Sequence, residues 1–221
     1  MRTIFDCSDP GSRAAGLSAA QASLKSGGLV VLPTDTLYAI TADPFDATAV
    51  GTLFEAKQRR RNMPVSVLVG SWDTIDGLVY SVPARARDLI RAFWPGGLSL
   101  VVQQAPSLAL DLGDTRGTIM LRMPLHPIAL DLLREVGPLA QSSANVSGHP
   151  GASSVHEARE QLGSQVAVYL DGGPVTEGVA STILDLTADS PRILRNGAVP
   201  ATQVAEVLGV APASLMPTGR R

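Results

Sequence analysis

Hydrophobic and polar positions follow two different periods along this chain. Apolar residues recur three or four positions apart in five segments, which predicts helices with one buried face at 12–25, 46–57, 83–94, 127–135 and 202–208. Short, nearly continuous apolar runs predict buried strands at 29–32, 65–69, 98–103, 118–123, 139–141, 166–170, 181–186 and 192–194. Residues 104–117 keep no period and predict a loop, while the spacing of Ser154 and Glu157 predicts a capped helix start.

The order of these elements predicts one α/β domain. Helices and strands alternate over most of the chain, but several late strands follow each other without an intervening helix. We therefore expect a single-domain, twisted, mixed parallel and antiparallel sheet with flanking helices. The domain is expected over residues 1–210, followed by a flexible C-terminal tail over residues 211–221.

The apolar run 29–32 ends abruptly in small polar residues. Pro33 cannot donate to a strand ladder, so pairing is expected to weaken where Thr34, Asp35 and Thr36 begin. The turn then offers two hydroxyls and a carboxylate at the edge of an α/β sheet, where such folds bind their ligands. The alternative is that these side chains only hold a loop together through local bonds to the backbone.

Several cations stand in places where a surface charge is not expected. Lys57 continues the inward stripe of Val50, Leu53 and Phe54, although a lysine at a helix end can also extend to solvent. Residues 57–61 hold four cations in a short connection from helix to strand, where they can converge on one anion. Arg122 near the end of a buried strand requires an anionic partner, either in a core salt bridge or in a ligand.

A second cluster of small polar side chains follows a strand at residues 142–148. If the strand ends meet, Thr34, Ser143 and Ser181 would face the four cations Lys57, Arg59, Arg122 and Arg195. Arginine binds carboxylate or phosphate through a forked pair of bonds. The sequence therefore predicts a site for a substrate that combines phosphates with a small zwitterion.

Composition limits the class of protein. The chain has 221 residues, 45% hydrophobic and 17% charged, which is typical of a globular protein, and its net charge of −2 gives no overall attraction to nucleic acid. Cys7 is the only cysteine, which fits a reducing compartment. With no leader and no apolar run of 18 residues, we expect a cytoplasmic protein without a membrane span.

Familiar nucleotide and metal motifs are absent. The chain has neither a GxxxxGK[ST] loop nor a GxGxxG fingerprint, so a nucleotide site would have to be built in another way. The histidines at 126, 149 and 156 form no ligand pattern with Cys7, and we expect no metal site made by protein side chains. Ser143 lacks the G-x-S-x-G surroundings of a serine hydrolase.

Six motifs in one order resemble a known family. They are PTDTLYAI at 33–40, KQR at 57–59, TIMLRMPLHPIAL at 118–130, SSANVSG at 142–148, STILDL at 181–186 and ILRNG at 193–197. Together they resemble the YrdC/Sua5/TsaC family of threonylcarbamoyl-AMP synthases, from about Gly27 to Leu208. The resemblance implies a YrdC-like catalytic domain without the extra C-terminal domain of longer relatives.

The resemblance implies a nucleotidyltransferase. Members of this family form L-threonylcarbamoyladenylate and pyrophosphate from L-threonine, bicarbonate and ATP, for the N6-threonylcarbamoyladenosine modification at position 37 of tRNA. The product would then pass to the tRNA threonylcarbamoyl-transferase complex, with a contact to tRNA itself among the expectations. Mg²⁺ would arrive with ATP and leave with pyrophosphate rather than bind to protein ligands.

Roles for individual residues follow from the same resemblance. The threonine-binding residues would be Thr34, Arg122 and Ser181, and the catalytic residues would be Lys57 and Arg59. The nucleotide-binding residues would be Arg59, Thr118, Ser143, Asn145 and Arg195. The chain departs from the common family pattern at Ala39, Met63, Leu68, Gly151 and Asn196.

Two other functions remain open from the sequence. One is a non-catalytic module that binds double-stranded RNA or tRNA through a basic patch made by Arg59, Arg60, Arg61, Arg85, Arg87 and Arg91. The net charge and the low aromatic content of 4% speak against it. The other is a carbamoyl-adenylate enzyme that acts on a different acceptor, as in the hydrogenase-maturation relatives of the family.

Overall fold

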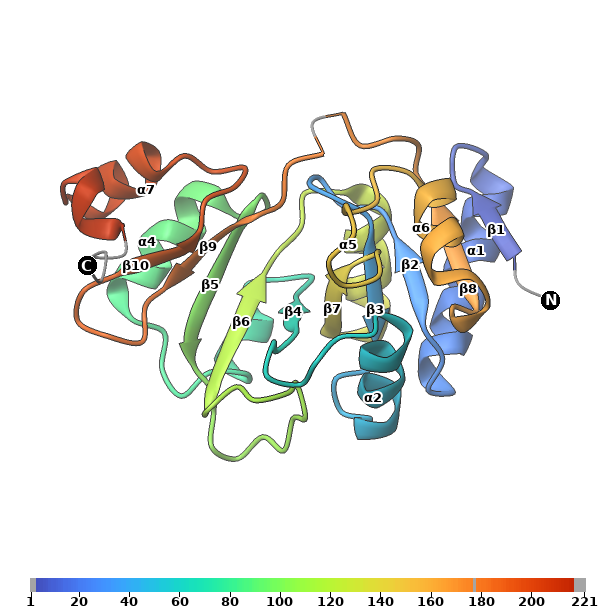
Figure 1. Ribbon diagram of the computed structural model, residues 1–221, viewed down its shortest axis with the longest axis horizontal. Coiled ribbons are helices and arrows are strands. Elements are labelled where there is room, and N and C mark those ends of the chain that lie inside the picture. Colours follow the sequence, from blue (N-terminus) through green and yellow to red (C-terminus); the bar gives the residue numbers. More distant parts are fainter. Residues whose placement is uncertain (1–2, 177, 217–221) are drawn as a thin grey trace.

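A ten-stranded sheet runs through the whole molecule (Figure 1). The structure is a computed structural model and describes residues 3–176 and 178–216. The strands lie in the order β1-β8-β2-β3-β7-β4-β6-β5-β9-β10. Their bounds are β1 Thr3–Asp6, β2 Val30–Leu32, β3 Ala39–Ala42, β4 Ser66–Leu68, β5 Leu98–Gln103, β6 Thr118–Arg122, β7 Leu139–Ser143, β8 Val168–Asp171, β9 Thr182–Asp185 and β10 Arg192–Arg195.

The sheet is mixed, as the sequence predicts. Four neighbouring pairs are parallel, namely β1 with β8, β2 with β8, β4 with β6 and β5 with β9. The other pairs, β2 with β3, β3 with β7, β4 with β7, β5 with β6 and β9 with β10, are antiparallel. All eight predicted strands are present, and β1 and β3 are additional. The pattern misses β3 because its four residues AITA follow the polar turn without a new apolar run of their own.

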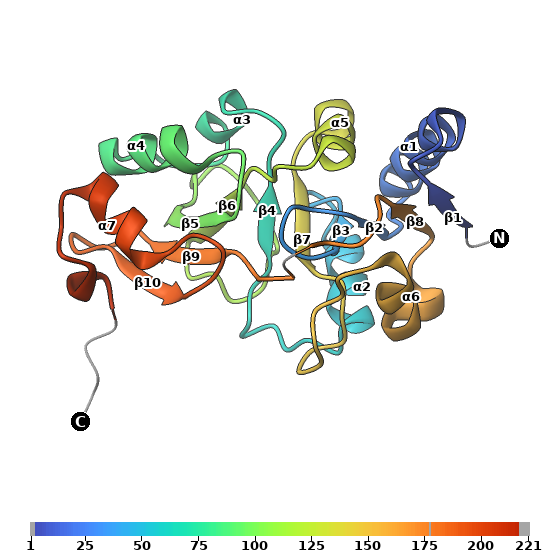
Figure 2. The same ribbon diagram turned by 90° about the horizontal axis from the view of Figure 1, so that it is seen from above.

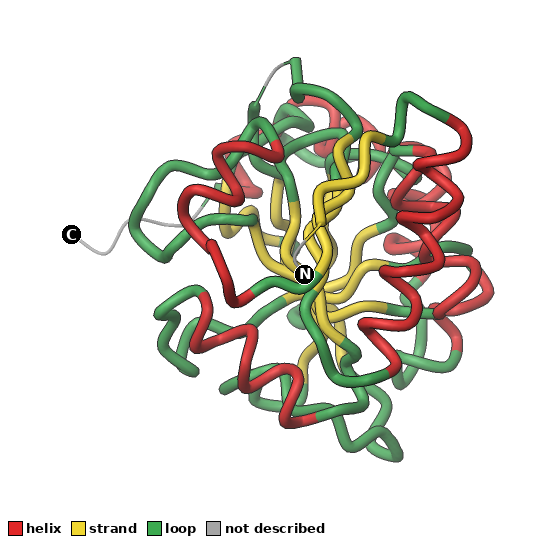
Figure 3. Tube along the Cα trace, turned by 90° about the vertical axis from the view of Figure 1, so that its right-hand side faces the viewer, coloured by secondary structure: helices red, strands yellow, loops and turns green. Residues whose placement is uncertain are grey.

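Helices cover both sides of this sheet, and the end-on view shows the strands as a central layer (Figure 3). Helices α1, α3, α4 and α5 lie along one side and α2 and α6 on the other (Figure 2). Their bounds are α1 Pro10–Lys25, α2 Ala47–Ala56, α3 Asp73–Asp76, α4 Ala84–Phe93, α5 Pro127–Val136, α6 Val155–Leu162 and α7 Ala201–Leu208, with 3-10 turns η1 Gly163–Gln165 and η2 Pro212–Leu215. Each predicted helix is therefore confirmed, whereas the single turn of α3 is too short for a periodic pattern.

Polar side chains fix where α2 and α6 begin. The Asp46 carboxylate accepts hydrogen bonds from the backbone N–H groups of Thr48 and Ala49, as expected for an N-cap. Ser154 accepts from the Glu157 N–H, and the Glu157 carboxylate reaches back to the N–H of Ser153. The predicted capping box is thus formed, with its return bond one residue earlier than in the usual pattern.

Alternation along the strands separates the core from a polar face. On β5, Leu98 and Leu100 are buried in the same apolar cluster as Leu89 of α4, and Ser99 between them points to the opposite side of the sheet. On β6, Leu121 joins the same cluster. The apolar residues therefore anchor these strands against helices and leave their alternate residues facing a cavity.

The end of the chain is more ordered than the sequence suggests. The prediction of a flexible tail from residue 211 is wrong for its first part, because Pro212–Leu215 forms η2 and Leu215 is buried in the main apolar cluster. The turn packs against α7 and β10. Residues 217–221 lie outside the described residues. Among residues 3–176 and 178–216, no helix has both the length and the apolar character needed to cross a bilayer.

Shortening Leu215 tests this packing. Leu215 is 1% exposed, so Leu215→Ala should lower the free energy of unfolding by about 2–4 kcal/mol through lost burial and a residual cavity. The neighbouring Met216 is 40% exposed, and Met216→Ala serves as the control with a change below about 0.5 kcal/mol. Denaturant unfolding measures both, and equal values for the two variants would show that η2 is not part of the core.

Candidate functional site

One cavity opens over the polar face of the central strands. It holds about 660 Å³ of space, its open mouth included, and no carboxylate is among the described residues that line it. The lining residues are Thr34, Thr36, Leu37, Tyr38, Arg59, Pro64, Val65, Ser66, Ser99, Met120, Arg122, Gln141, Ser142, Ser143, Ala180, Ser181, Ile183 and Arg195. Three arginines and seven serines and threonines from distant parts of the chain thus share one wall, which suits an anionic ligand.

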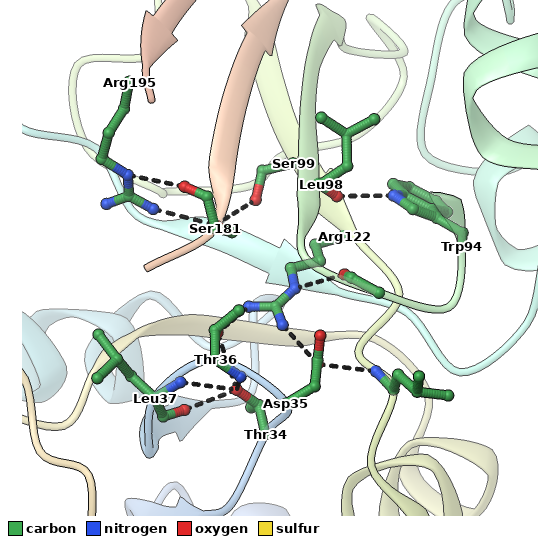
Figure 4. Close-up of polar contacts among 12 residues, drawn as sticks. Thr34, Asp35, Thr36, Leu37, Trp94, Leu98, Ser99, Arg122, Ser181 and Arg195 are labelled. Atoms are coloured by element: carbon green, nitrogen blue, oxygen red, sulfur yellow. Dashed lines mark hydrogen bonds and ion pairs between the residues drawn. The ribbon is translucent and has the colours of Figure 1, made fainter. Parts of the chain in front are cut away.

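The turn after β2 forms one side of this cavity (Figure 4). The Thr34 hydroxyl donates to the carbonyl of Leu37 at 2.6 Å and accepts from the backbone N–H of Thr36 at 3.2 Å. The Thr36 hydroxyl lies 3.1 Å from it. The same hydroxyls thus hold the loop together, as the alternative expects, and also line the cavity.

Arg122 is buried and paired. Its side chain is almost fully enclosed, and its guanidinium donates to the Asp35 carboxylate at 2.5 Å, to the Thr36 hydroxyl at 2.7 Å and to the carbonyl of Gly96 at 2.9 Å (Figure 4). Burial lowers the pKa of Arg122, and the Asp35 carboxylate opposes that shift. The predicted anionic partner is thus Asp35, which also accepts from the N–H of Leu125 at 2.8 Å.

A β-bulge aims Arg195 at the cavity. Along β10, Ile193 pairs with Leu184, but Arg195 rather than Leu194 pairs with Ile183 of the cavity wall. A regular ladder would place Leu194 opposite Ile183, and the extra residue moves the arginine to that face instead. Arg195 then donates to the carbonyl of Ser181 at 2.9 Å and to its hydroxyl at 3.0 Å (Figure 4).

Arg59 is held by its own loop. The chain leaves α2 through Gln58, whose φ of 50° is left-handed, and turns so that the Arg59 guanidinium donates to the carbonyls of Met63 at 2.6 Å and Pro64 at 3.1 Å. Burial lowers the pKa of Arg59, and the positive charge of Arg195 adds to the effect. Two guanidinium groups that repel each other across a cavity without a carboxylate favour an anion between them.

Lys57 is buried beside the cavity but does not line it. Its ammonium donates to the carbonyls of Ser143 and Asn145, each at 2.5 Å, and its own carbonyl accepts from the N–H of Ser147 at 2.8 Å. The predicted inward lysine is confirmed, and its contacts are to the end of β7 and to the loop that follows. Burial, with a smaller contribution from the Arg59 charge, lowers the pKa of Lys57 to about 7.

Two other predicted site residues also lie outside the cavity wall. Thr118 begins β6, four residues before Arg122, and its hydroxyl donates to the carbonyl of Thr115 at 2.7 Å. The Asn145 amide donates to the carbonyls of Val146 and His149, and its buried Oδ1 has no hydrogen-bond partner in the described part of the chain.

The wall therefore contains six of the predicted residues: Thr34, Arg59, Arg122, Ser143, Ser181 and Arg195. Sequence reasoning missed Ser66, Ser99 and Gln141. Ser66 and Ser99 each stand alone inside an apolar strand, where a lone serine could have indicated a face turned toward a site. Gln141 pairs with Ser66 across β7 and β4, a neighbour relation that the sequence does not contain.

One departure from the family pattern has a clear steric reason. A Cβ at Gly151 would lie 2.6 Å from Cδ1 of Leu37, which lines the cavity, so glycine leaves room for that side chain. Leu68 is fully buried against α5 and does not reach the cavity, while Met63 is half exposed.

The predicted basic patch does not form. Arg60 and Arg61 follow α2, whereas Arg85, Arg87 and Arg91 belong to α4, and the two helices lie on opposite sides of the sheet (Figure 2). Arg61 forms an ion pair with Asp111, and Arg85 donates to the carbonyls of residues 186, 188 and 189. These arginines therefore do not share one RNA-binding surface.

Comparison with known proteins identifies the family. Residues 22–197 match the Sua5/YciO/YrdC family model, whose description reads "Telomere recombination". The chain belongs to the Sua5/YciO/YrdC family. A Mycobacterium tuberculosis member named "Putative threonylcarbamoyl-AMP synthase" is 62% identical over 215 residues, which cover 97% of this chain and 99% of the relative. The Bacillus subtilis threonylcarbamoyl-AMP synthase is 36% identical over 87% of this chain and 56% of its own length.

Solved Sua5/YciO/YrdC structures share the fold. Sua5 of Pyrococcus abyssi, carrying the H234A/Y235A substitutions, superposes with a TM-score of 0.89 at 33% identity, covering 96% of this chain. The chain spans 63% of the length of that protein. A second crystal structure of the same archaeal Sua5, complexed with L-threonine, gives a TM-score of 0.87 at 32% identity. Escherichia coli YciO, at 23% identity and a TM-score of 0.79, supports the fold alone.

The buried position of Lys57 predicts a specific dependence of stability on pH. Between pH 7 and 10.5 the unfolded chain keeps its proton on Lys57 whereas the folded chain has lost it, so this group makes the protein more stable as pH rises. Relative to Lys57→Met, the free energy of unfolding of the wild type should rise with a slope approaching about 1.4 kcal/mol per pH unit.

Denaturant unfolding from pH 7 to 10 measures this slope. Lys25, the other lysine of the chain, is exposed at the end of α1, so Lys25→Met should leave the wild-type pH dependence unchanged. Parallel curves for the wild type and Lys57→Met would show that the ammonium is not desolvated in the folded state.

Proposed function

We propose that this chain is an L-threonylcarbamoyladenylate synthase, which forms threonylcarbamoyl-AMP and pyrophosphate from L-threonine, bicarbonate and ATP. The observation that carries the proposal is the cavity that gathers Arg59, Arg122 and Arg195 with seven serine and threonine hydroxyls and no carboxylate among its described lining residues. The names of the relatives that match almost the whole chain support the same activity.

The amino acid would occupy the end of the cavity near Thr34, Arg122 and Ser181. Three of the five N–H groups of the Arg122 guanidinium are used by Asp35, Thr36 and Gly96, which leaves two for a substrate carboxylate. Because Asp35 sets the orientation of this guanidinium, the carboxylate would meet a fixed fork. The structure of the Pyrococcus abyssi relative complexed with L-threonine supports threonine as the amino acid.

The triphosphate would occupy the end near Arg59, Arg195 and Ser143. Both guanidinium groups are held by backbone carbonyls, so they need little rearrangement to meet phosphate oxygens. Lys57 fixes the backbone of Ser143 and Asn145 beside them, and the Asn145 side chain itself lies outside the wall. Thr118 lies outside the wall, and we assign it no nucleotide contact.

The rate of this reaction depends more on the alignment of the two substrates and on the stabilisation of negative charge than on proton transfer. Threonine and bicarbonate combine to a carbamate with loss of water. A carbamate oxygen then bonds to the α-phosphorus as the bond to the pyrophosphate oxygen breaks. Fixed guanidinium groups align the two anions and stabilise the negative charge on the phosphate oxygens and on the leaving pyrophosphate.

Mg²⁺ fits this scheme as part of the nucleotide substrate. Magnesium prefers oxygen ligands and keeps several of its waters, so phosphates can hold it without a protein cage. The described wall offers hydroxyl and amide oxygens only, and the described residues contain no group of three or more His, Cys, Asp or Glu side chains arranged to hold a metal. The product is an activated acyl-adenylate, which a tRNA threonylcarbamoyl-transferase complex would consume at adenosine 37.

The decisive experiment follows pyrophosphate release. The wild type should release pyrophosphate only when threonine, bicarbonate and Mg²⁺-ATP are all present. Arg59→Ala should lower kcat/KM by about 10²-fold or more, since it removes a cation at the reacting phosphates. Arg60→Ala removes the same charge from an exposed neighbour outside the wall and is the matched control. Equal activity in the two variants would contradict the proposed role of Arg59.

Two further measurements separate the competing functions. Pyrophosphate release with another acceptor but not with threonine would assign the chain to a related carbamoyl-adenylate enzyme. Salt-sensitive tRNA binding without any turnover of ATP would assign it to RNA binding instead.

A further inference from the structure

Ser99 occupies a special place behind the proposed threonine site. It lies on β5, is 1% exposed, and contributes to the cavity wall next to Ile183, its partner across β5 and β9. Its hydroxyl lies 2.9 Å from the hydroxyl of Ser181 (Figure 4). Within the described part of the chain, this is the one hydrogen bond that the Ser99 side chain makes.

The hydrogen-bond inventory decides which hydroxyl donates. A buried O–H that does not donate is costly, and only one of the two protons can be used between Ser99 and Ser181. Ser99 is 1% exposed and Ser181 6%, so the Ser181 proton is the one with access to the cavity and Ser99 donates to Ser181. Ser181 Oγ also accepts from the Arg195 guanidinium at 3.0 Å. With both lone pairs of its oxygen occupied, Ser181 keeps its own proton for an acceptor in the cavity that it lines.

The neighbouring Thr34 hydroxyl has the opposite polarity. The Thr34 proton is used by the carbonyl of Leu37, and the Thr34 oxygen accepts from the N–H groups of Thr36 and Leu37 at 3.2 and 3.3 Å. Ser181 therefore has a proton to donate at this end of the wall, whereas Thr34 does not.

We propose that Ser99 is a positioning residue for threonine binding, which acts through Ser181 and does not itself contact the substrate. This inference rests on the proposed function. Ser99 and Arg195 together orient the Ser181 hydroxyl so that it donates to an acceptor atom of the amino acid, either its unprotonated amine or its side-chain oxygen. Without Ser99, Arg195 alone donates to the Ser181 oxygen, and the Ser181 proton is no longer fixed toward the substrate.

Steady-state kinetics on the full chain test this role. Ser99→Ala should raise KM for threonine about 3- to 10-fold and leave KM for ATP unchanged, because one hydrogen bond at the threonine end is lost. Ser99→Thr keeps the hydroxyl and should restore the threonine KM. The thermal unfolding midpoint of Ser99→Ala should equal that of the wild type, because the substitution removes one oxygen and leaves Leu98 and Leu100 packed in the core.

The double variant gives the sharpest result. If Ser99 acts only through Ser181, adding Ser99→Ala to Ser181→Ala should cause no further increase in the threonine KM. Additive effects of the two substitutions would overturn the proposal, since they would show a direct contact of Ser99 with the substrate. An equal increase in both KM values, or a failure of Ser99→Thr to restore threonine binding, would overturn it as well.

Calorimetric titration with L-threonine keeps this test separate from the test of the reaction. If the wild type binds threonine but releases no pyrophosphate, the proposed function fails, and weaker threonine binding by Ser99→Ala still supports the role of Ser99. If turnover is normal and Ser99→Ala matches the wild type in both assays, only the role of Ser99 fails. If the wild type binds no threonine, both proposals are overturned.

Discussion

The ion pair between Arg122 and Asp35 is the interaction on which this site depends. A buried guanidinium without an anion is strongly destabilising, so this pair and the bonds to Thr36 and Gly96 form one unit. The unit joins three segments that are far apart in sequence: the turn after β2, the loop before β5 and the end of β6 (Figure 4). The contacts that neutralise the buried charge of Arg122 therefore also bring together the three segments around the cavity.

A general division of labour follows from this arrangement. The carboxylate that holds Arg122 belongs to Asp35, which is outside the cavity wall, whereas backbone carbonyls hold Arg59 and Arg195. All three guanidinium groups line the cavity. The acceptors fix each guanidinium, while the lining residues leave its remaining N–H groups without a competing carboxylate. The positive groups of this wall repel one another when no ligand is bound, and a polyanionic ligand reduces that repulsion.

Much of this architecture could be predicted from the pattern of residues. Helical periods, apolar runs and the capping spacing of Ser154 and Glu157 located every element except β1, β3 and the single-turn helices, because those elements carry neither a distinct apolar run nor a full helical period. The match of six motifs located most of the cavity wall. The contacts of Lys57 could not be predicted, since its acceptors are backbone carbonyls that any residue carries. The pairing of Asp35 with Arg122 could not be predicted either, because it requires the end of β6 to lie opposite the turn after β2.

The bulge in β10 has a consequence for how this protein can vary. Because the bulge absorbs Leu194, an arginine rather than a leucine meets Ile183. Deletion of residue 194 would place Arg195 directly after Ile193, and a regular ladder would then carry the arginine opposite Ile183 without a bulge. Alignments of such sequences should accordingly allow a one-residue gap at this point of the strand.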